Sequence, residues 1–169
     1  MFKGTYRHKI DPKGRLPVPA AFRRLMTAAG ADGLVVTLLD QCLAAYPPEE
    51  WARLEAQFAA LPAFSRPVKT LSRLLASRAT DCALDVQGRI LLPPALRQAA
   101  RLTREAVVVG VLNRIEVWEP EAWSTFLRES ERVLDDVSLE VQWPVSPAPP
   151  EAAPAPAHGA ARPQAKPKR

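Results

Sequence analysis

A short motif that occurs twice constrains the fold of this 169-residue chain more than any other feature. Residues 11–23 align with residues 85–97 at a spacing of 74 residues, with six identical positions. The alignment continues from residues 43–51 to residues 115–123 at a spacing of 72, a slip of two residues that loop variation between strands explains. We therefore interpret the chain as a tandem duplication of a unit of about 50 residues.

Each unit is predicted to contain a strand, a turn, a second strand, a helix, two further strands and a helix. In the first unit, strands at 34–39 and 42–46 are predicted to form a tight hairpin, and their counterparts meet around Asn113 and Arg114. A unit of this size is marginally stable alone, so we expect an α+β fold in which two units share a core as an intrachain pseudo-dimer. The expected limits are 1–51 for the first unit, 52–78 for a helical connector, 79–123 for the second unit, 124–143 for a C-terminal helix and 144–169 for a disordered, basic tail rich in Pro and Ala.

Positive charge is concentrated at the start of the chain. Residues 1–24 hold seven Lys and Arg against a single Asp, a net charge of +6, while residues 25–143 carry a net −4 and residues 144–169 a net +3. A cationic segment on an acidic body indicates a polyanionic partner, of which nucleic acid is the commonest. The alternative is a solvated basic surface that has no partner.

The sequence shows no catalytic or metal-binding constellation. Its two histidines, His8 and His158, are far apart, and it has neither a phosphate-binding loop nor a CxxC pair. We therefore expect no enzymatic activity, no cofactor, no metal and no small-molecule substrate. No apolar run approaches the roughly 20 residues of a membrane helix, and no secretory signal is visible. The chain is thus expected in the cytoplasm, with Cys42 and Cys82 as reduced, buried thiols.

The repeated Asp-x-x-Gly-Arg motif is the main candidate for function. Its Asp and Gly have the chemistry of a tight turn, in which the Asp accepts bonds from backbone amides and the Gly takes a left-handed conformation. The Arg that follows can fold back onto the Asp, or it can offer bidentate contacts to a phosphate or a guanine edge, and both roles can hold. The predicted turn residues are Asp11, Gly14, Asp85 and Gly88.

The two units differ in the strand that leads into the motif. Where the first unit has basic residues at positions 7, 9 and 13, the second has Asp81, Ala83 and Gln87. We infer that the first unit does most of the polyanion binding and that the second serves chiefly for assembly, with Arg89 either structural or in contact with DNA. The candidate DNA-binding residues are Lys3, Arg7, Lys9, Lys13, Arg15 and Arg89.

A series of short segments runs in order from residue 1 to about residue 140, at residues 1–4, 11–19, 42–47, 50–51, 79–89, 109–110 and 116–118. In these segments the chain resembles the MraZ family of bacterial transcriptional regulators. The resemblance implies two tandem AbrB/SpoVT-like swapped-hairpin domains and a ring-shaped homo-oligomer. It further implies a nucleoid-associated regulator that binds double-stranded DNA at short direct repeats upstream of its own gene, the first of the division and cell wall cluster. Members of the family act mainly as repressors of that cluster, and some as activators. The family's Asp-x-x-x-Arg signature falls on Asp11 with Arg15 and on Asp85 with Arg89.

Two other functions remain open from the sequence. Swapped-hairpin folds also form non-enzymatic protein–protein assembly modules of the antitoxin type, in which the basic segment would meet an acidic protein face. An enzyme built on a small β-barrel is a third reading, and it lacks a candidate nucleophile.

Overall fold

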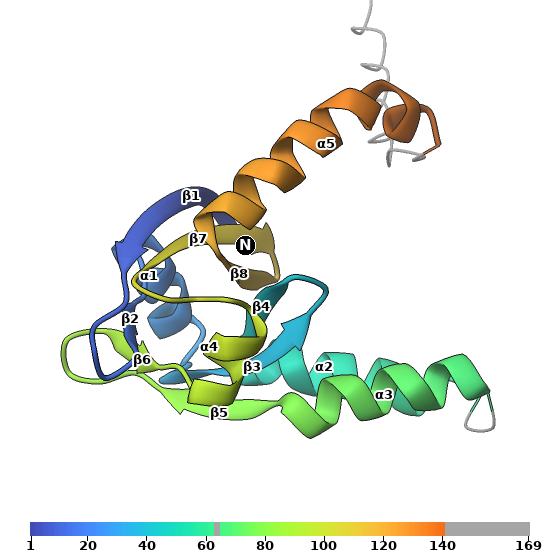
Figure 1. Ribbon diagram of the computed structural model, residues 1–169. Coiled ribbons are helices and arrows are strands. Elements are labelled where there is room, and N and C mark those ends of the chain that lie inside the picture. The colour runs from blue at the N-terminus through green and yellow to red at the C-terminus, as the bar shows by residue number, and fades with distance from the viewer. Residues whose placement is uncertain (63–64, 141–169) are drawn as a thin grey trace, which may run out of the picture. The chain divides into compact units, whose positions relative to one another are not determined.

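A computed structural model describes residues 1–62 and 65–140. The chain divides into two compact parts, Met1–Val133, which holds both repeat units, and Leu134–Arg169. The described residues of the second part are the end of a helix that begins in the first. Residues 141–143 of the predicted C-terminal helix and the predicted tail at 144–169 lie outside the described residues. The elements, drawn in Figure 1, are β1 (Phe2–Lys9), β2 (Arg15–Pro17), α1 (Ala20–Ala28), β3 (Gly33–Leu39), β4 (Cys42–Tyr46), α2 (Pro48–Ala59), α3 (Arg66–Arg78), β5 (Thr80–Ala83), β6 (Arg89–Leu91), α4 (Pro94–Ala99), β7 (Glu105–Leu112), β8 (Arg114–Trp118) and α5 (Pro120–Glu140).

The predicted order of elements within each unit is confirmed. The series β1, β2, α1, β3, β4, α2 recurs as β5, β6, α4, β7, β8, α5, and α3 links the two series. The predicted hairpin of β3 and β4 is present, with Leu39 opposite Cys42. The expected domain limits at residues 51 and 123 fall inside α2 and α5, because each of these helices starts a few residues earlier, at Pro48 and Pro120.

The two units exchange their first strands. The six-stranded sheet has the order β1-β7-β8-β4-β3-β5, and β2 and β6 form a separate antiparallel pair. Strand β1 of the first unit therefore pairs with β7 of the second, while β5 of the second unit pairs with β3 of the first (Figure 1). This exchange is the swapped-hairpin arrangement expected for an α+β pseudo-dimer. Because each hairpin is completed by a strand of the other unit, the two units form one fold.

An approximate two-fold axis relates the units. In the β2–β6 pair, Leu16 lies opposite Ile90, which is its own equivalent in the repeat. In the β4–β8 pair, Ala44 lies opposite its equivalent, Glu116. A residue faces its own repeat only where a two-fold axis passes between the two, as in an isologous dimer interface. The axis therefore passes through these two pairs.

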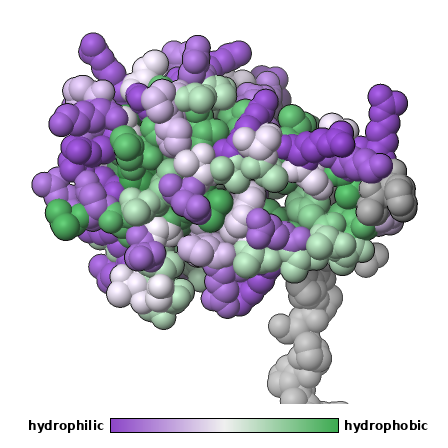
Figure 2. All heavy atoms as spheres, turned by 90° about the horizontal axis from the view of Figure 1, so that it is seen from below, coloured by the Kyte–Doolittle hydropathy of each residue, from purple (hydrophilic) through white to green (hydrophobic). Residues whose placement is uncertain are grey.

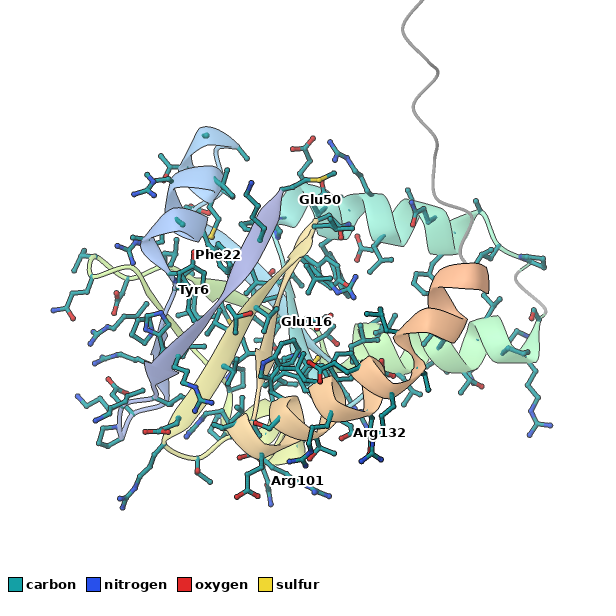
Figure 3. The ribbon with its side chains drawn as sticks, turned by 90° about the horizontal axis from the view of Figure 1, so that it is seen from above. Tyr6, Phe22, Glu50, Arg101, Glu116 and Arg132 are labelled. Carbon is teal, nitrogen blue, oxygen red and sulfur yellow. The ribbon has the colours of Figure 1, made fainter. Side chains whose placement is uncertain are left out.

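Both units contribute to the hydrophobic core. Leu16 and Phe22 of the first unit and Ile90 and Leu96 of the second belong to the same cluster of side chains, each at most 5% exposed. Full burial of such a side chain contributes about 1.5–3 kcal/mol. Tyr6 of β1 packs edge-on against Phe22, with ring centroids 5.1 Å apart (Figure 3), so the inner face of β1 is fixed to this core.

Equivalent aromatic pairs hold α2 and α5 against the other face of the sheet. Tyr46 of β4 meets Trp51 of α2 at a centroid distance of 5.8 Å, and Trp118 of β8 meets Trp123 of α5 at 5.5 Å. In the second unit Phe126 extends the cluster, 5.1 Å from Trp118 and 5.6 Å from Trp123. None of the helices in the described residues is long and apolar enough to cross a membrane.

Candidate nucleic-acid interface

The predicted turn of the first unit is fixed by backbone hydrogen bonds. The Gly14 N–H donates to the Asp11 carbonyl at 2.9 Å, and the Asp11 carboxylate accepts from the N–H groups of Lys13 and Arg15 at 2.9 and 2.8 Å. Gly14 has a φ of +88°, in the left-handed region that favours glycine. Arg15 is therefore attached to a backbone that its own aspartate holds in place.

The second unit repeats this turn and adds an ion pair. The Asp85 carboxylate accepts from the backbone N–H groups of Gln87 and Arg89, both at 2.9 Å. The Arg89 guanidinium then returns to the same carboxylate, with Nε at 2.8 Å and Nη2 at 2.7 Å. Both of these nitrogens meet Oδ2 of the carboxylate, while Oδ1 accepts the two backbone N–H groups. Arg89 is thus committed to its own turn.

Arg15 is held much more loosely than Arg89. Its Nη1 lies 3.8 Å from the Asp11 carboxylate, without a side-chain hydrogen bond, and 37% of its side chain is exposed against 25% for Arg89. Arg89 also lies 3.8 Å from Asp11, so that carboxylate is shared between two arginines. The pKa of Asp11 is lowered mainly by the hydrogen bond from the Arg15 backbone N–H, whereas the Arg89 side chain is the main cause of the lowered pKa of Asp85. The two equivalent arginines therefore differ in their freedom to meet a ligand.

Each glycine of the two turns is covered by an arginine of the other unit. A Cβ on Gly14 would come within 2.8 Å of the Arg97 side chain, and one on Gly88 within 2.5 Å of Arg23. Arg23 also donates to the carbonyl of Val18 at 2.6 Å, and Arg97 donates to the equivalent carbonyl in its own unit at 3.2 Å. The two arginines occupy identical positions of the repeat, but the sequence pattern indicated no role for them. Through them, α1 of the first unit packs onto the turn of the second, and α4 of the second unit packs onto the turn of the first.

The basic residues of β1 lie on its outer face. Lys3, Arg7 and Lys9 are exposed, while Tyr6 and His8 between them are half-buried, as the two-residue period of a strand requires. Lys3 and Lys9 are six residues apart, which spans about 20 Å in an extended strand. In the described part of the chain, none of these three side chains forms a salt bridge.

Lys13 continues this row into the turn, exposed and likewise outside the salt bridges of the described residues. Arg15 starts β2, next to this turn, whereas Arg89 starts β6, the strand that pairs with β2. On the view of Figure 2, hydrophilic residues crowd the left side, where Figure 1 draws the two turns. At the equivalent positions β5 has Asp81 and Ala83, so the basic row belongs to one unit alone.

His8, which the sequence argued against as a catalytic residue, lies on this strand. Its side chain points inward, and its Nε2 is buried without a hydrogen-bond partner in the described part of the chain. Burial, with the positive charge of Arg23 as a second cause, lowers the pKa of His8. The imidazole is therefore neutral at physiological pH, and it adds no charge to the row of basic residues around it.

The remaining features lie away from the basic row. Cys42 and Cys82 are free and buried, as predicted, and burial raises the pKa of the two thiols to about 12 and about 11. A cavity of about 730 Å³ opens between α1, the start of α2 and the β7–β8 turn, where Leu25, Glu50 and Asn113 line it. None of the predicted DNA-binding residues is part of its lining.

Comparison with known proteins identifies the family. A family model described as MraZ protein, antitoxin-like, matches residues 1–74 and again residues 75–138. The transcriptional regulator MraZ of Limosilactobacillus reuteri (strain DSM 20016) is 44% identical over 141 residues, which cover 83% of this chain and 97% of that protein. The transcriptional regulator MraZ of Ligilactobacillus salivarius (strain UCC118) is 45% identical over 139 residues, 82% of this chain and 94% of its own. With two successive matches to one family model, and relatives that align over most of its length, this chain belongs to the MraZ family.

Proposed function

We propose that this protein is a sequence-specific, DNA-binding transcriptional regulator, as the names of its relatives suggest, and that it is not an enzyme. The observation that carries the proposal is the state of Arg15. Its backbone is fixed by the Asp11 turn, while its side chain is 37% exposed and its Nη1 lies 3.8 Å from the carboxylate of Asp11. A guanidinium on a rigid support loses little conformational entropy when it makes a bidentate contact with guanine or phosphate.

The basic row supplies the second part of the proposed interface. Lys3, Arg7, Lys9 and Lys13 would bind phosphates, which sets affinity and orientation without reading sequence. Arg15 and its neighbours would read base edges or groove shape. This division predicts that substitutions in the row weaken binding to every duplex alike, whereas Arg15 substitutions act on the preferred duplex.

Arg89 has a different part in this proposal. Its guanidinium makes two close contacts with Asp85, and a DNA contact would have to compete with them. We therefore assign Arg89 to the second turn and to the pairing of the two units, and we place the main contact on the first unit.

A structural role for the basic row is the alternative that needs testing. Strand β1 is at one edge of the sheet, and lysines on edge strands prevent pairing with other chains. Edge protection predicts that removing the charges causes aggregation and leaves DNA binding unaffected. Phosphate binding predicts a loss of DNA affinity from a protein that remains soluble.

The resemblance to the family supports a more detailed proposal. The regulator would form a ring-shaped homo-oligomer in the cytoplasm, associated with the nucleoid. It would bind short direct repeats upstream of its own gene and repress the division and cell wall cluster. One Asp-x-x-Gly-Arg turn binds DNA weakly. Several turns on one closed oligomer bind more tightly, because the first contact raises the effective concentration of the others. Successive repeats spaced like successive protomers would exploit this gain.

The first test is fluorescence anisotropy with DNA from upstream of the protein's own gene and a scrambled duplex of equal length. Tight binding to the native duplex alone supports the proposal. Titrations at several salt concentrations should give a log–log slope of about −0.9 for each phosphate contacted. Equal binding to both duplexes would contradict a sequence-specific regulator. An operator-independent protein complex that is insensitive to salt would favour the antitoxin-like assembly module instead.

A further inference from the structure

Helix α3 covers one apolar face of α2. Trp51, Leu54 and Phe58 of α2 line a groove of about 240 Å³ together with Leu75 and Ala76 of α3. The position of α3 is fixed by a hydrogen bond from the hydroxyl of a buried threonine in β3 to the Leu75 carbonyl, at 2.9 Å. In the first unit, therefore, the helix that follows β4 is covered by the helix that comes next in the chain.

The equivalent face of α5 has no such cover within the described residues. Trp123, Phe126 and Leu127 are the repeat equivalents of Trp51, Leu54 and Glu55, 72 residues further along the chain. Phe126 and Leu127 are 45% and 39% exposed, and Val133, two turns further along α5, is 47% exposed. Within the described residues, no helix follows α5 as α3 follows α2. The second unit thus presents an apolar surface at the place where the first unit binds a helix.

The predicted tail at 144–169 is poorly suited to cover this surface. Residues 144–169 include eight Pro and eight Ala, and no large hydrophobic residue occurs after Val145. A segment of this composition has few side chains to pack against an aromatic and aliphatic face.

Helix α3 offers a complementary surface on a second copy of the chain. Leu71 and Leu74 are 45% and 46% exposed, and neither belongs to the groove that α3 forms with α2. Figure 2 shows hydrophobic atoms open to solvent among hydrophilic ones on the right, where Figure 1 draws α2 and α3. The sequence of α3 contains four basic residues and no acidic one, whereas that of α5 contains six acidic and two basic residues. Opposite net charge favours contact between α3 and α5 over contact between two copies of either helix.

We propose that the apolar face of α5, formed by Phe126, Leu127 and Val133, binds the Leu71 and Leu74 face of α3 in a second copy of the chain. This inference rests on the proposed homo-oligomer and assigns its interface. The contact is heterologous, since each copy uses two different surfaces, and a heterologous contact generates a ring when its rotation closes. It uses neither β1 nor the two turns, so the proposed DNA-binding residues stay free in the assembly.

The test is a complementation experiment with two variants of the full chain. One variant carries Leu71→Lys and Leu74→Lys on α3, and the other carries Leu127→Glu and Val133→Glu on α5. Val86→Lys serves as the control, because Val86 is the most exposed apolar side chain of the described residues and belongs to neither surface. Light scattering after size-exclusion chromatography gives the mass of each, and circular dichroism checks folding.

We expect a multimer for the wild type and the control, and a mass near the 18.5 kDa of one chain for each double variant. An equimolar mixture of the two variants should give a dimer, because one intact α3 face and one intact α5 face remain. A wild-type multimer that either variant leaves unchanged would overturn the inference and leave the proposed function standing. If only the α5 variant lost assembly, the contact would be symmetric, between two copies of α5, and the inference would likewise be overturned.

A monomeric wild type would instead contradict the ring of the proposed function, and this inference with it. If a double variant loses helical signal, the milder single changes Leu74→Ser and Leu127→Ser replace it. Each of these should weaken self-association at least tenfold in sedimentation equilibrium, and an unchanged association constant for both would overturn the inference.

Discussion

Replacing Gly110 with alanine should separate strand β1 from the sheet. Gly110 lies opposite Gly4 in the antiparallel β1–β7 pair. A Cβ at position 110 would come within 2.6 Å of the Phe2 carbonyl carbon and 2.8 Å of the Lys3 Cα, and it would also clash with the Lys3 backbone nitrogen. These are backbone atoms, so no side-chain rotation relieves the overlap. The N-terminal part of β1 has to move away from β7.

The expected cost follows from what this movement breaks. Each ladder hydrogen bond lost at the N-terminal end of β1 removes about 0.5–1.5 kcal/mol. Phe2, which is 6% exposed, would lose part of a burial contribution of about 1.5–3 kcal/mol. We therefore expect Gly110→Ala to lower the free energy of unfolding by about 3–4 kcal/mol. Gly30→Ala is the matched control: its φ is +69° but nothing lies within 4 Å of the added Cβ, so the conformational cost alone is about 1–2 kcal/mol.

Urea unfolding of both variants at one fixed protomer concentration measures the difference, since self-association contributes to apparent stability. Amide exchange in β1 should be accelerated in Gly110→Ala and unchanged in Gly30→Ala. DNA affinity should fall as well, because β1 carries Lys3, Arg7 and Lys9. A free energy of unfolding for Gly110→Ala equal to or above that of Gly30→Ala would contradict the close backbone contact between β1 and β7.

Three further predictions concern titratable groups. The folded state lowers the pKa of His8, so acidification below its ordinary value of 6.5 protonates the unfolded chain first and destabilises the fold; His8→Gln should remove this part of the pH dependence of urea unfolding. Asp11 and Asp85 also have lowered pKa values, so they stabilise the fold fully above pH 3.8, and this stability is lost as the pH falls through their folded-state pKa values. Asp85→Asn should therefore reduce the loss of unfolding free energy at acidic pH. An unchanged acid dependence would contradict the role of the Arg89–Asp85 pair. Cys42 and Cys82, with pKa values of about 12 and about 11, should react with a thiol reagent at mildly alkaline pH only after denaturation, and rapid reaction of the native protein would contradict their burial.

The fold was largely predictable because the repeat was visible. The 74-residue spacing between the two Asp-x-x-Gly-Arg motifs placed both turns, and the proline-flanked apolar stripes placed the helices. The residues alone did not determine whether β1 pairs with the β3–β4 hairpin or with the β7–β8 hairpin. The alternation of exposed residues, such as Lys3 and Arg7, with inward-facing ones is the same in both cases. The exchange was expected from the family resemblance, and the pairing of β1 with β7 confirms it.

The candidate site was predictable only in part. Its turns follow from local chemistry, because the Asp11 and Asp85 carboxylates bond to amides within four residues. The roles of Arg23 and Arg97 depend on glycines of the opposite unit, which no local pattern indicates. The difference between Arg15 and Arg89 is one of side-chain conformation: the same motif sequence supports a loose pair at 3.8 Å and a close pair with two nitrogens on one carboxylate oxygen.

Binding of native and scrambled duplexes by Arg15→Ala and Arg89→Ala tests the central claim most directly. A lost bidentate base contact costs about 1–3 kcal/mol for each reader, a factor of roughly 5 to 150, and an oligomer multiplies this over several turns. Arg15→Ala should therefore reduce the affinity for the native duplex to that for the scrambled one, while the assembly keeps its wild-type mass. Arg89→Ala should retain a clear preference for the native duplex. Normal binding by Arg15→Ala would contradict the assignment of Arg15 as the residue that reads DNA.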